Sequence, residues 1–550
     1  MSMRSPLGYV VPDETARVTR AAFPKGNLYM EMQTELGMLY TNHQFASLFS
    51  ATGQPAEDPA RLALILVMQT IESLPDRQTA DAVRGRIDWK YALALELTDP
   101  GFDESVLSEF RKRLVTGQLE LLLLDSLLQQ LQERGLLKAR GTQRTDSTQI
   151  LAAVRTVNRL ELVIETMRLA LNRLAAHHAE WLWPRLDPAW RERYELRAET
   201  SRLPKEDSKR QALASQVGAD GFRLLAAIFA ETTPPEVRAE PAVEVLRRVW
   251  IQQYYGPDDP PRWRGEKDVP ASGLLIHSPY DIEARYSSKR GEAWVGYKVH
   301  YSETCDAERP NLITNVLTTA STVQDDTALP LIHQALAARE LLPAEHLVDC
   351  GYTDAENLLT SQSKHQVRIV GRVADNPSWQ ARAGEGFAKV NFTLNWERQV
   401  ATCPMGKESY SWLPHSASDT AKGEFQIRFR RKDCTPCSSR AQCTKAKVEP
   451  RILFVQARDE HDVLQAARAA QETEAFRAEY ALRSGVESLI SQGTRAFGLR
   501  KARYIGCART HLQHVLVAVA INLVRFLAWV REPQQTPPRV SAFTRLATLT

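Results

Sequence analysis

Cysteine is scarce in this sequence. Seven cysteines occur among 550 residues, an odd number and too few for a disulfide-stapled scaffold, which is typical of a protein of the reducing cytoplasm. The sequence also lacks a Gly-rich phosphate-binding loop of the G-x-x-x-x-G-K-[ST] kind, which argues against the use of ATP. No charged stretch followed by an apolar run stands at the N-terminus, so we expect no signal peptide.

Long apolar runs without polar interruptions are absent too. The best candidate for a membrane span, Leu512–Val530, contains Gln513, His514, Asn522 and Arg525, which the interior of a bilayer tolerates poorly. We therefore interpret this segment as the buried core helix of a globular protein. The composition agrees, with 43% hydrophobic and 25% charged residues. The length predicts about three or four domains at roughly 150 residues each.

Acidic residues are missing from one long stretch. Between Ser488 and Arg531 there is no Asp or Glu, although seven basic residues occur there: Arg495, Arg500, Lys501, Arg503, Arg509, Arg525 and Arg531. A second basic run, interrupted only by Asp433, contains Arg428, Arg430, Arg431, Lys432, Arg440, Lys445 and Lys447. Such runs are typical of a protein that binds a polyanion such as nucleic acid, but a solvated basic face has the same pattern.

The N-terminal part, residues 30–140, is predicted to be an all-α domain. Helical periodicity marks Arg61–Leu74, Arg77–Arg86, Ser105–Leu114 and Leu119–Arg134, with Asp103 as the N-cap of the third helix. Short helices joined by polar turns are typical of helix-turn-helix DNA-binding modules, and equally of small helical bundles in general.

Residues 141–365 follow an α/β pattern that contains a helical insertion. The expected strands are Thr142–Val154, Ala293–Glu303, Leu312–Ala320 and His346–Tyr352, and a helix is expected at Asp325–Glu340. Residues of about 156–270 are highly charged and helical in pattern, so they form an insertion after the first strand.

Residues 366–455 differ in sequence pattern from the segments on either side. They alternate in strand fashion, contain many turn residues and hold four of the seven cysteines, which indicates a β-rich insertion. Helix resumes at about Asp462 and continues to Arg531 with a break near Gly498. Residues 456–531 form the last folded part, and residues 532–550, with three prolines, form a tail.

Three acidic residues have a context that favours chemistry. Asp146 lies in the first expected strand, Asp349 ends the fourth, and Glu487 lies on a late helix. Carboxylates at strand ends and on a packed helix can converge on hard cations such as Mg²⁺, which promote phosphodiester chemistry. Taken singly, Asp146 is also compatible with a turn or cap, Asp349 with a strand-end turn, and Glu487 with a surface helix position.

Two neighbours strengthen the interpretation of Glu487. Tyr480 and Arg483 precede it by seven and four residues, so the spacing predicts that all three share one helix face. An Arg one turn from a metal-binding carboxylate is well placed to hold a DNA phosphate through two hydrogen bonds. The alternative is an ordinary Arg–Glu pair on a helix surface.

Four of the cysteines form a separate pattern. Cys403 lies in C-P-M-G, and Cys434, Cys437 and Cys443 form C-x2-C-x5-C. Four thiolates suit tetrahedral zinc, and such a site would be structural because no ligand position stays open. The alternative is four free thiols in a strand-rich insertion. Cys305, Cys350 and Cys507 have no such company.

The motifs together resemble bacterial insertion-sequence transposases of the DDE type. The matching pieces are T-D-S-T (145–148), G-Y-K-V-H (296–300), V-D-C-G-Y (348–352), Y-x2-R-x3-E (480–487), R-A-F-G-L-R-K-A-R-Y-I-G (495–506) and H-L-Q-H-V-L-V-A-V-A-I-N-L-V-R (511–525). Upstream, G-Q-P (53–55) and S-V-L-S-E-F-R-K-R-L (105–114) resemble that group's N-terminal helical domain. The resemblance extends over residues of about 40–530.

The resemblance implies a fold and a site. The fold is an α/β RNase H-like catalytic core with an N-terminal all-α domain, a helical insertion after strand one and a β-rich, Cys-containing insertion after strand four. Asp146, Asp349 and Glu487 would be the catalytic acids that bind Mg²⁺ or Mn²⁺. Residues expected to contact DNA are Tyr480, Arg483, Arg495, Arg500, Lys501, Arg503 and Lys298. Many relatives carry a Lys seven residues after the Glu, where this chain has Thr494.

The implied activity is DNA cleavage and strand transfer at the ends of an insertion sequence. Water would attack a phosphodiester first, and the freed 3′ hydroxyl would then attack target DNA. Two alternatives stay open: a catalytically inactive DNA-binding relic that acts as a regulator, and an RNase H-like nuclease without strand transfer. The expected partners are double-stranded DNA and a second copy of the chain, without ATP or a membrane, in the bacterial cytoplasm at the nucleoid.

Overall fold

The computed structural model describes residues 8–50, 52–155, 157–256, 260–289, 291–376, 378–415, 425–531 and 546. The chain divides into two compact units. Unit 1 comprises Met1–Lys138, Ser147–Val323 and Glu487–Thr550, and unit 2 comprises Ala139–Asp146 and Gln324–Val486. The predicted tail, residues 532–550, lies outside the described residues apart from residue 546.

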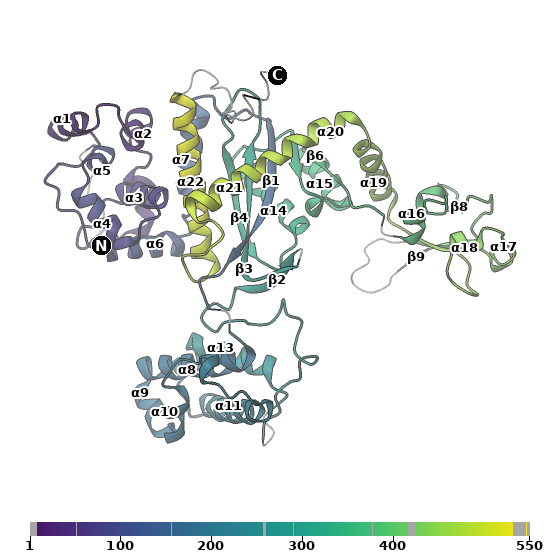
Figure 1. Ribbon diagram of the computed structural model, residues 1–550, viewed down its shortest axis with the longest axis horizontal. Helices are drawn as coiled ribbons and strands as arrows, with labels where there is room; N and C mark the ends of the chain where they lie inside the picture. Colours follow the sequence, from purple (N-terminus) through teal and green to yellow (C-terminus); the bar gives the residue numbers. More distant parts are fainter. Residues whose placement is uncertain are drawn as a thin grey trace. The chain divides into compact units, whose positions relative to one another are not determined.

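The largest sheet has six strands and is mixed, which confirms the expected α/β class (Figure 1). Its order is β2-β3-β1-β5-β6, with β4 paired to β3. The strands are β1 (Thr142–Leu151), β2 (Arg285–Lys289), β3 (Glu292–Thr304), β4 (Ile313–Ala320), β5 (Glu345–Val348) and β6 (Arg368–Gly371). β3 is antiparallel to β2 and β4, whereas β5 is parallel to β1 and β6. The first part of β1 belongs to unit 2 and the rest to unit 1.

Unit 1 begins with the predicted N-terminal helical region. Its elements are α1 (Asp13–Ala22), α2 (Leu28–Leu36), η1 (Asn42–Leu48), α3 (Pro59–Glu72), α4 (Asp76–Gly85), α5 (Ile87–Ala92), α6 (Ser105–Thr116) and α7 (Leu122–Glu133). Helix α3 starts where Asp58 accepts the N–H of Arg61 over 3.0 Å and Pro59 occupies the first turn. Sequence reasoning did not assign α1, because its apolar residues are few.

The apolar segment near the C-terminus is the buried core helix that the sequence predicts. Helix α22 (Cys507–Arg531) is long and apolar enough to cross a membrane by composition, yet 72% of its most apolar stretch is buried inside the protein. It packs on β4, α3 and α7, and Figure 1 shows it beside α7. The Asn522 amide bonds both the N–H and the carbonyl oxygen of Ile313, at 2.7 and 2.9 Å. The polar side chain of Asn522 is therefore satisfied within the apolar core.

Residues between β1 and β2 form the helical insertion, which has an apolar core of its own. Its helices are α8 (Arg159–His177), α9 (Ala179–Leu182), η2 (Trp183–Arg185), α10 (Pro188–Tyr194), η3 (Thr200–Arg202), α11 (Asp207–Ile228), α12 (Pro235–Arg238) and α13 (Pro241–Gln253). Asn158 and Glu161 form a capping box at the start of α8. Gly221 lets α11 approach α13, since a Cβ there would lie 2.1 Å from the Trp250 ring.

The predicted fourth strand, His346–Tyr352, ends earlier than expected. β5 ends at Val348, and Asp349 then caps the 3-10 helix η4 (Cys350–Tyr352) by accepting the N–H of Cys350. Helices α14 (Asp325–Ala338) and α15 (Ala355–His365) flank this segment. The β propensity of residues 350–352 is overridden because the Asp349 side chain offers the backbone a local partner.

The position of the β-rich insertion is also corrected. The sequence places it after strand four, but Arg368–Gly371 forms β6 of the main sheet and pairs in parallel with β5. The insertion therefore follows β6, the sixth strand of the main sheet in chain order. An alternating pattern such as R-I-V-G identifies a strand but not the partner that it pairs with.

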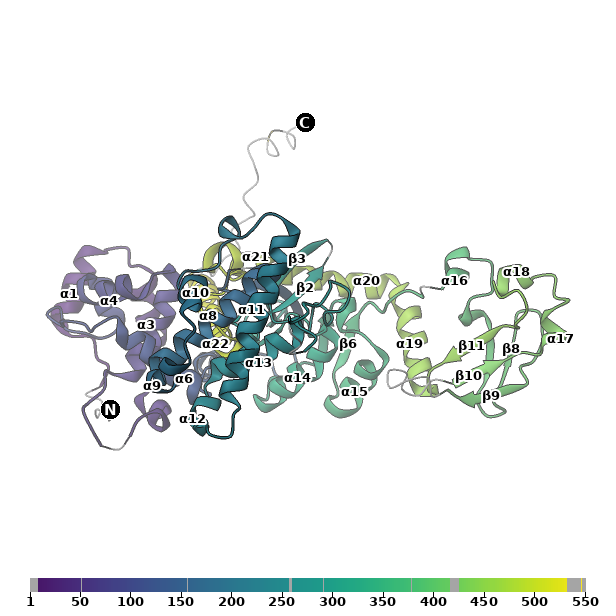
Figure 2. The same ribbon diagram turned by 90° about the horizontal axis from the view of Figure 1, so that it is seen from below.

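The insertion contains two small antiparallel sheets with a core of aromatic and aliphatic residues. Its elements are α16 (Trp379–Ala383), η5 (Lys389–Asn391), β7 (Thr393–Asn395), β8 (Val400–Thr402), β9 (Ser411–Pro414), β10 (Phe425–Arg428), α17 (Arg431–Cys434), α18 (Arg440–Cys443) and β11 (Ile452–Val455). Figure 2 shows β9, β10 and β11 side by side with α17 and α18 in the same lobe.

The late helical region is interrupted more often than predicted. Instead of one helix from Asp462 to Gly498, the chain forms α19 (Arg458–Gln471), α20 (Glu474–Ala481), the 3-10 helix η6 (Leu482–Ser484) and α21 (Gly485–Phe497). Thr473 caps α20 by accepting the N–H of Phe476. The second interruption shapes the candidate site.

Candidate active site

Asp146 and Asp349 come from neighbouring strands of unit 2. β1 and β5 pair in parallel, and Thr145 opposite Val348 is the last pair of the register. Each aspartate directly follows one member of that pair: Asp146 lies within β1, which continues to Leu151, and Asp349 is the first residue after β5. Parallel pairing of β1 and β5 thus brings together residues that are 203 positions apart (349 − 146).

Arg483 of η6 lies between the two carboxylates. Its Nη2 atom is 2.7 Å from Oδ2 of Asp146 and 3.7 Å from Oδ2 of Asp349. The side chains of Arg483 and Asp146 are 15% and 13% exposed, whereas Asp349 is 34% exposed. Nη2 is thus occupied, but the buried Nε of Arg483 has no hydrogen-bond partner. A guanidinium with an unused donor at an acidic centre can accept a further anion.

Arg144 explains why the helix is interrupted beside this centre. Its Nη1 donates to the carbonyl oxygen of Leu482 over 2.6 Å, which takes an acceptor away from the helical ladder. Gly485 leaves room for this side chain, because an added Cβ would lie 2.0 Å from that same Nη1 atom and would displace the guanidinium. The side chain of Arg144, from β1, therefore sets the 3-10 turn that carries Arg483.

This turn corrects one prediction. Tyr480, Arg483 and Glu487 do not share the face of one continuous α-helix, because they lie on α20, η6 and α21. A pattern of i, i+3 and i+7 positions assumes 3.6 residues per turn throughout, and the 3-10 turn changes that period.

Tyr480 is half-buried and stacks on Phe476, with ring centroids 5.5 Å apart and an angle of 12° between the planes. Burial raises the pKa of its hydroxyl, and the nearby charge of Arg483 opposes that rise. The hydroxyl therefore stays protonated at neutral pH and remains a hydrogen-bond donor.

Glu487 lies in the first turn of α21 and its side chain is exposed. It is the residue at which the chain passes from unit 2 to unit 1. The contacts described above join Asp146, Asp349 and Arg483, and Glu487 is not part of that contact group.

A buried chain of hydrogen bonds begins at Thr145, the residue before Asp146, and the sequence did not reveal it. Thr145 Oγ1 and Nε2 of His346 lie 2.6 Å apart, and Nδ1 of His346 lies 2.9 Å from Nε2 of His333. Burial lowers the pKa of His333 to about 4 and that of His346 well below its ordinary value. Both rings are therefore neutral at pH 7. The available signal was a polar residue, His346, next to the apolar pair Leu347 and Val348 of β5.

The remaining predicted DNA-contacting residues lie in unit 1. Arg495, Arg500, Lys501 and Arg503 are exposed, and Lys298 is partly buried on β3. The loop from Gly498 to Gly506 runs beside β1, with the Leu151 N–H donating to the Arg500 carbonyl oxygen over 2.8 Å. Arg500 Nε contacts Thr148 Oγ1 at 3.2 Å. Thr494, at the family's Lys position, bonds the carbonyl oxygen of Ile490.

The chemistry of unit 2 fits a divalent cation. Two carboxylates on adjacent strands offer oxygen ligands of the kind that Mg²⁺ prefers, and the Arg483 guanidinium already occupies a cation position between them. Among the described residues, no three His, Cys, Asp or Glu side chains form a group ready to hold a metal ion. The four predicted zinc ligands lie elsewhere in unit 2, around one cavity.

Comparison with known protein families identifies the class. The model described as Transposase DDE domain matches residues 402–527, and the model described as Transposase domain (DUF772) matches residues 17–113. The chain is thus a transposase, as the sequence motifs indicate. More narrowly, it belongs among transposases with a DDE domain and an N-terminal DUF772 transposase domain.

The family matches include some of the candidate site residues and leave out others. Glu487, Tyr480 and Arg483 lie within the DDE match, whereas Asp146 and Asp349 lie outside both matches. Searches of curated proteins and of solved structures found no match.

Proposed function

We propose that the protein is an active DDE transposase that cleaves DNA at the ends of an insertion sequence and joins the freed ends to target DNA. One observation carries the proposal: Asp146 and Asp349 each follow the last residue pair of the adjacent parallel strands β1 and β5, and they share one cation, Arg483. In this proposal the six-stranded sheet serves as the RNase H-like core that the DDE domain implies.

Asp146 and Asp349 would hold a divalent cation, Mg²⁺ or Mn²⁺, and Glu487 would complete the site. When bound, such a cation activates the attacking oxygen and neutralises charge on the phosphate. The pairing of β1 with β5 fixes the two aspartates in advance, so little reorganisation accompanies the reaction.

Arg483 would exchange partners when DNA and cation bind. Its Nε is buried without an acceptor, and a phosphate oxygen would satisfy it. The guanidinium would then move from the carboxylates to the DNA backbone, where planar paired donors bind phosphate well. Tyr480, with its protonated hydroxyl, would donate a hydrogen bond to DNA nearby.

The basic residues of unit 1 would extend the DNA contact. Arg495, Arg500, Lys501 and Arg503 are exposed and have no acidic residue within their own stretch of sequence. Lysine and arginine contacts to phosphate give affinity without sequence selectivity. End recognition would then fall to the N-terminal helical region, and paired ends would require a homodimer.

The test is incubation with labelled linear DNA that carries the element's own ends, in Mg²⁺, in Mn²⁺ and in EDTA. We expect metal-dependent nicking at the ends, followed by joining to target DNA, and loss of both in Asp146→Ala and Glu487→Ala. Asp459→Ala is the control, because Asp459 is an exposed acid on α19. Nicking without joining would identify a nuclease, and binding without nicking a DNA-binding relic.

A further inference from the structure

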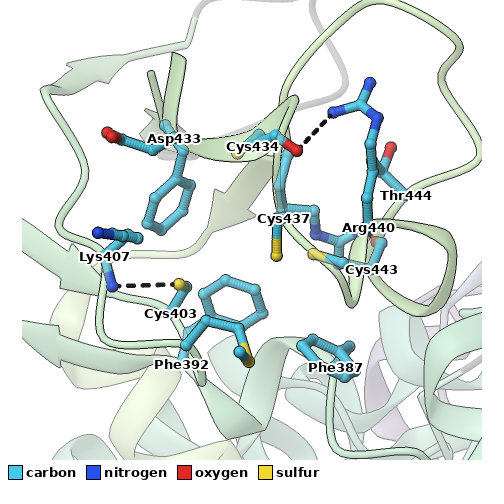
Figure 3. Close-up of a pocket in the computed structure, with 13 residues that line it drawn as sticks. Phe387, Phe392, Cys403, Lys407, Asp433, Cys434, Cys437, Arg440, Cys443 and Thr444 are labelled. Atoms are coloured by element: carbon cyan, nitrogen blue, oxygen red, sulfur yellow. Dashed lines mark hydrogen bonds between the residues drawn. The ribbon is translucent and has the colours of Figure 1, made fainter. Parts of the chain in front are cut away.

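The four cysteines of the β-rich insertion surround a single cavity of about 40 Å³. Cys403 follows β8, Cys434 ends α17, and Cys437 and Cys443 lie at the turn before α18 and at its end. Figure 3 shows the sulfur atoms of Cys403, Cys437 and Cys443 turned toward the same space. Segments about 30 residues apart in the chain thus bring their thiols together.

The backbone around Cys403 is shaped to hold a thiolate. The Lys407 N–H donates to Cys403 Sγ over 3.3 Å. The turn is closed by the Cys403 N–H donating to the Lys407 carbonyl oxygen over 2.9 Å, with Gly406 at a φ of +75°. An amide directed at sulfur favours the charged form, and a residue with a Cβ would be strained at Gly406.

The cavity is lined by phenylalanine rings, by three cationic side chains (Lys407, Arg440 and Arg451) and by one acid, Asp433. Phe387, Phe392 and Phe429 line it. Arg451 bonds the Cys443 carbonyl oxygen, its Nε is buried without an acceptor, and it forms no ion pair among the described residues. A partly buried guanidinium without an ion pair is stabilised by a nearby anion. A zinc ion with four thiolates carries a net charge of −2 and would supply that anion.

We propose that Cys403, Cys434, Cys437 and Cys443 bind one structural zinc ion. The thiols are not yet arranged as a formed metal site, so they turn inward and lose their protons when the ion binds. Four sulfur ligands leave no position for water, which excludes catalysis at this ion. Zinc would instead fix α17 and α18, which are each only four residues long.

The test is the metal content of the purified full-length protein, measured by mass spectrometry after dialysis without chelator. We expect one zinc ion per chain, and replacement by Co²⁺ should give the intense absorption of tetrahedral cobalt thiolate. Cys437→Ser should lose most of the zinc, whereas Cys305→Ser, whose cysteine lies outside the cavity, should keep it.

Thiol titration of the wild-type protein keeps the proposal testable even where Cys437→Ser does not fold. The four cavity thiols should react slowly until a chelator removes the metal, and then quickly. Zinc-free protein with freely reactive thiols, or thiols lost to disulfides without metal, would overturn the proposal. DNA cleavage is not the readout, so failure here leaves the transposase proposal untouched.

Discussion

We propose metal binding at two places in the described part of unit 2: the aspartate centre (Asp146, Asp349 and Arg483) and the thiol cavity (Cys403, Cys434, Cys437 and Cys443). In the first, acids surround a cation that the protein itself supplies. In the second, the thiols line a cavity with three cationic side chains, Lys407, Arg440 and Arg451, and one acid, Asp433. The charge imbalance therefore has opposite sign in the two places.

This difference in charge indicates that a metal ion has a different role in each of the two places. At the aspartate centre, Arg483 already offsets part of the carboxylate charge without metal, so we expect the fold not to depend on the ion, and the ion can enter with substrate. The thiol cavity is lined by Lys407, Arg440 and Arg451 against the single acid Asp433 until thiolates form, so we expect metal binding and local folding to be coupled. A metal lost from the first place should affect chemistry, and one lost from the second should affect stability.

The strongest way to break this comparison is Asp349→Asn. Asparagine keeps the shape and the capping bond to the Cys350 N–H but removes the charge. We expect end cleavage to fall by at least about 100-fold, since a preorganised electrostatic contact is worth that much. DNA binding and melting temperature should stay near wild type, because Asp349 is 34% exposed and 3.7 Å from Arg483. Cleavage at the wild-type rate would remove Asp349 from the site.

With a second variant, Arg483→Gln, we expect protein stability to depend on a metal ion at the aspartate centre, as we expect for the thiol cavity. Without the guanidinium, the mostly buried Asp146 loses its 2.7 Å partner. Stability in EDTA should fall by about 1–2 kcal/mol, and Mg²⁺ should restore most of it. Urea denaturation with and without Mg²⁺ measures both effects. Arg483→Lys, which keeps the charge, should depend on Mg²⁺ much less. Equal stability of Arg483→Gln and wild type in EDTA would contradict the charge-balance argument.

The support beneath the aspartate centre should respond to pH. His333, with a pKa lowered to about 4, and His346 face Thr145, Ser361 and the His365 ring. Unfolded histidine titrates near 6.5, so the unfolded chain binds more protons below that pH. This contribution to stability is complete above pH 6.5 and is lost as pH falls toward 4.

The size of this effect is on the order of 1 kcal/mol per buried histidine between pH 7 and pH 5. Urea denaturation of wild type and His333→Gln at both pH values measures it, because glutamine offers hydrogen bonds without titrating. We expect a shallower loss on acidification in the variant. Parallel pH dependence in the two proteins would show that His333 does not contribute.

The sequence predicted those parts of the fold that have a local signal. The period of Leu119–Arg134 indicated α7, and polar residues inside an apolar run indicated that α22 is a core helix. Asp146 was found inside the first expected strand, and Asp349 at the end of the fourth. The RNase H-like expectation and the roles of the three acids came from the resemblance, not from the spacing.

Contacts between residues far apart in the chain could not be predicted from the sequence. Arg144 reaches Leu482, which is 338 residues away in the chain, and no local period reveals that this contact interrupts the helix between Tyr480 and Glu487. The buried pair of His346 and His333 was missed for the same reason, because each histidine alone resembles an ordinary surface residue. Such pairs become visible only when the parallel strands are in register.

The smallest expected effect comes from Gly485→Ala, and its sign is the informative part. In a helix, replacing glycine by alanine normally stabilises by about 0.5–1 kcal/mol. Here the added Cβ would lie 2.0 Å from Arg144 Nη1, so the guanidinium must leave the Leu482 carbonyl oxygen. We expect a loss of about 1 kcal/mol in urea denaturation and weaker cleavage, because the turn that carries Arg483 relaxes.

Gly85→Ala, in α4 with no atom within 4 Å of the added Cβ, is the matched control and should be neutral or stabilising. A stabilised Gly485→Ala would mean that Arg144 does not set the turn, and the preorganisation of the aspartate centre would then rest on the β1–β5 pairing alone.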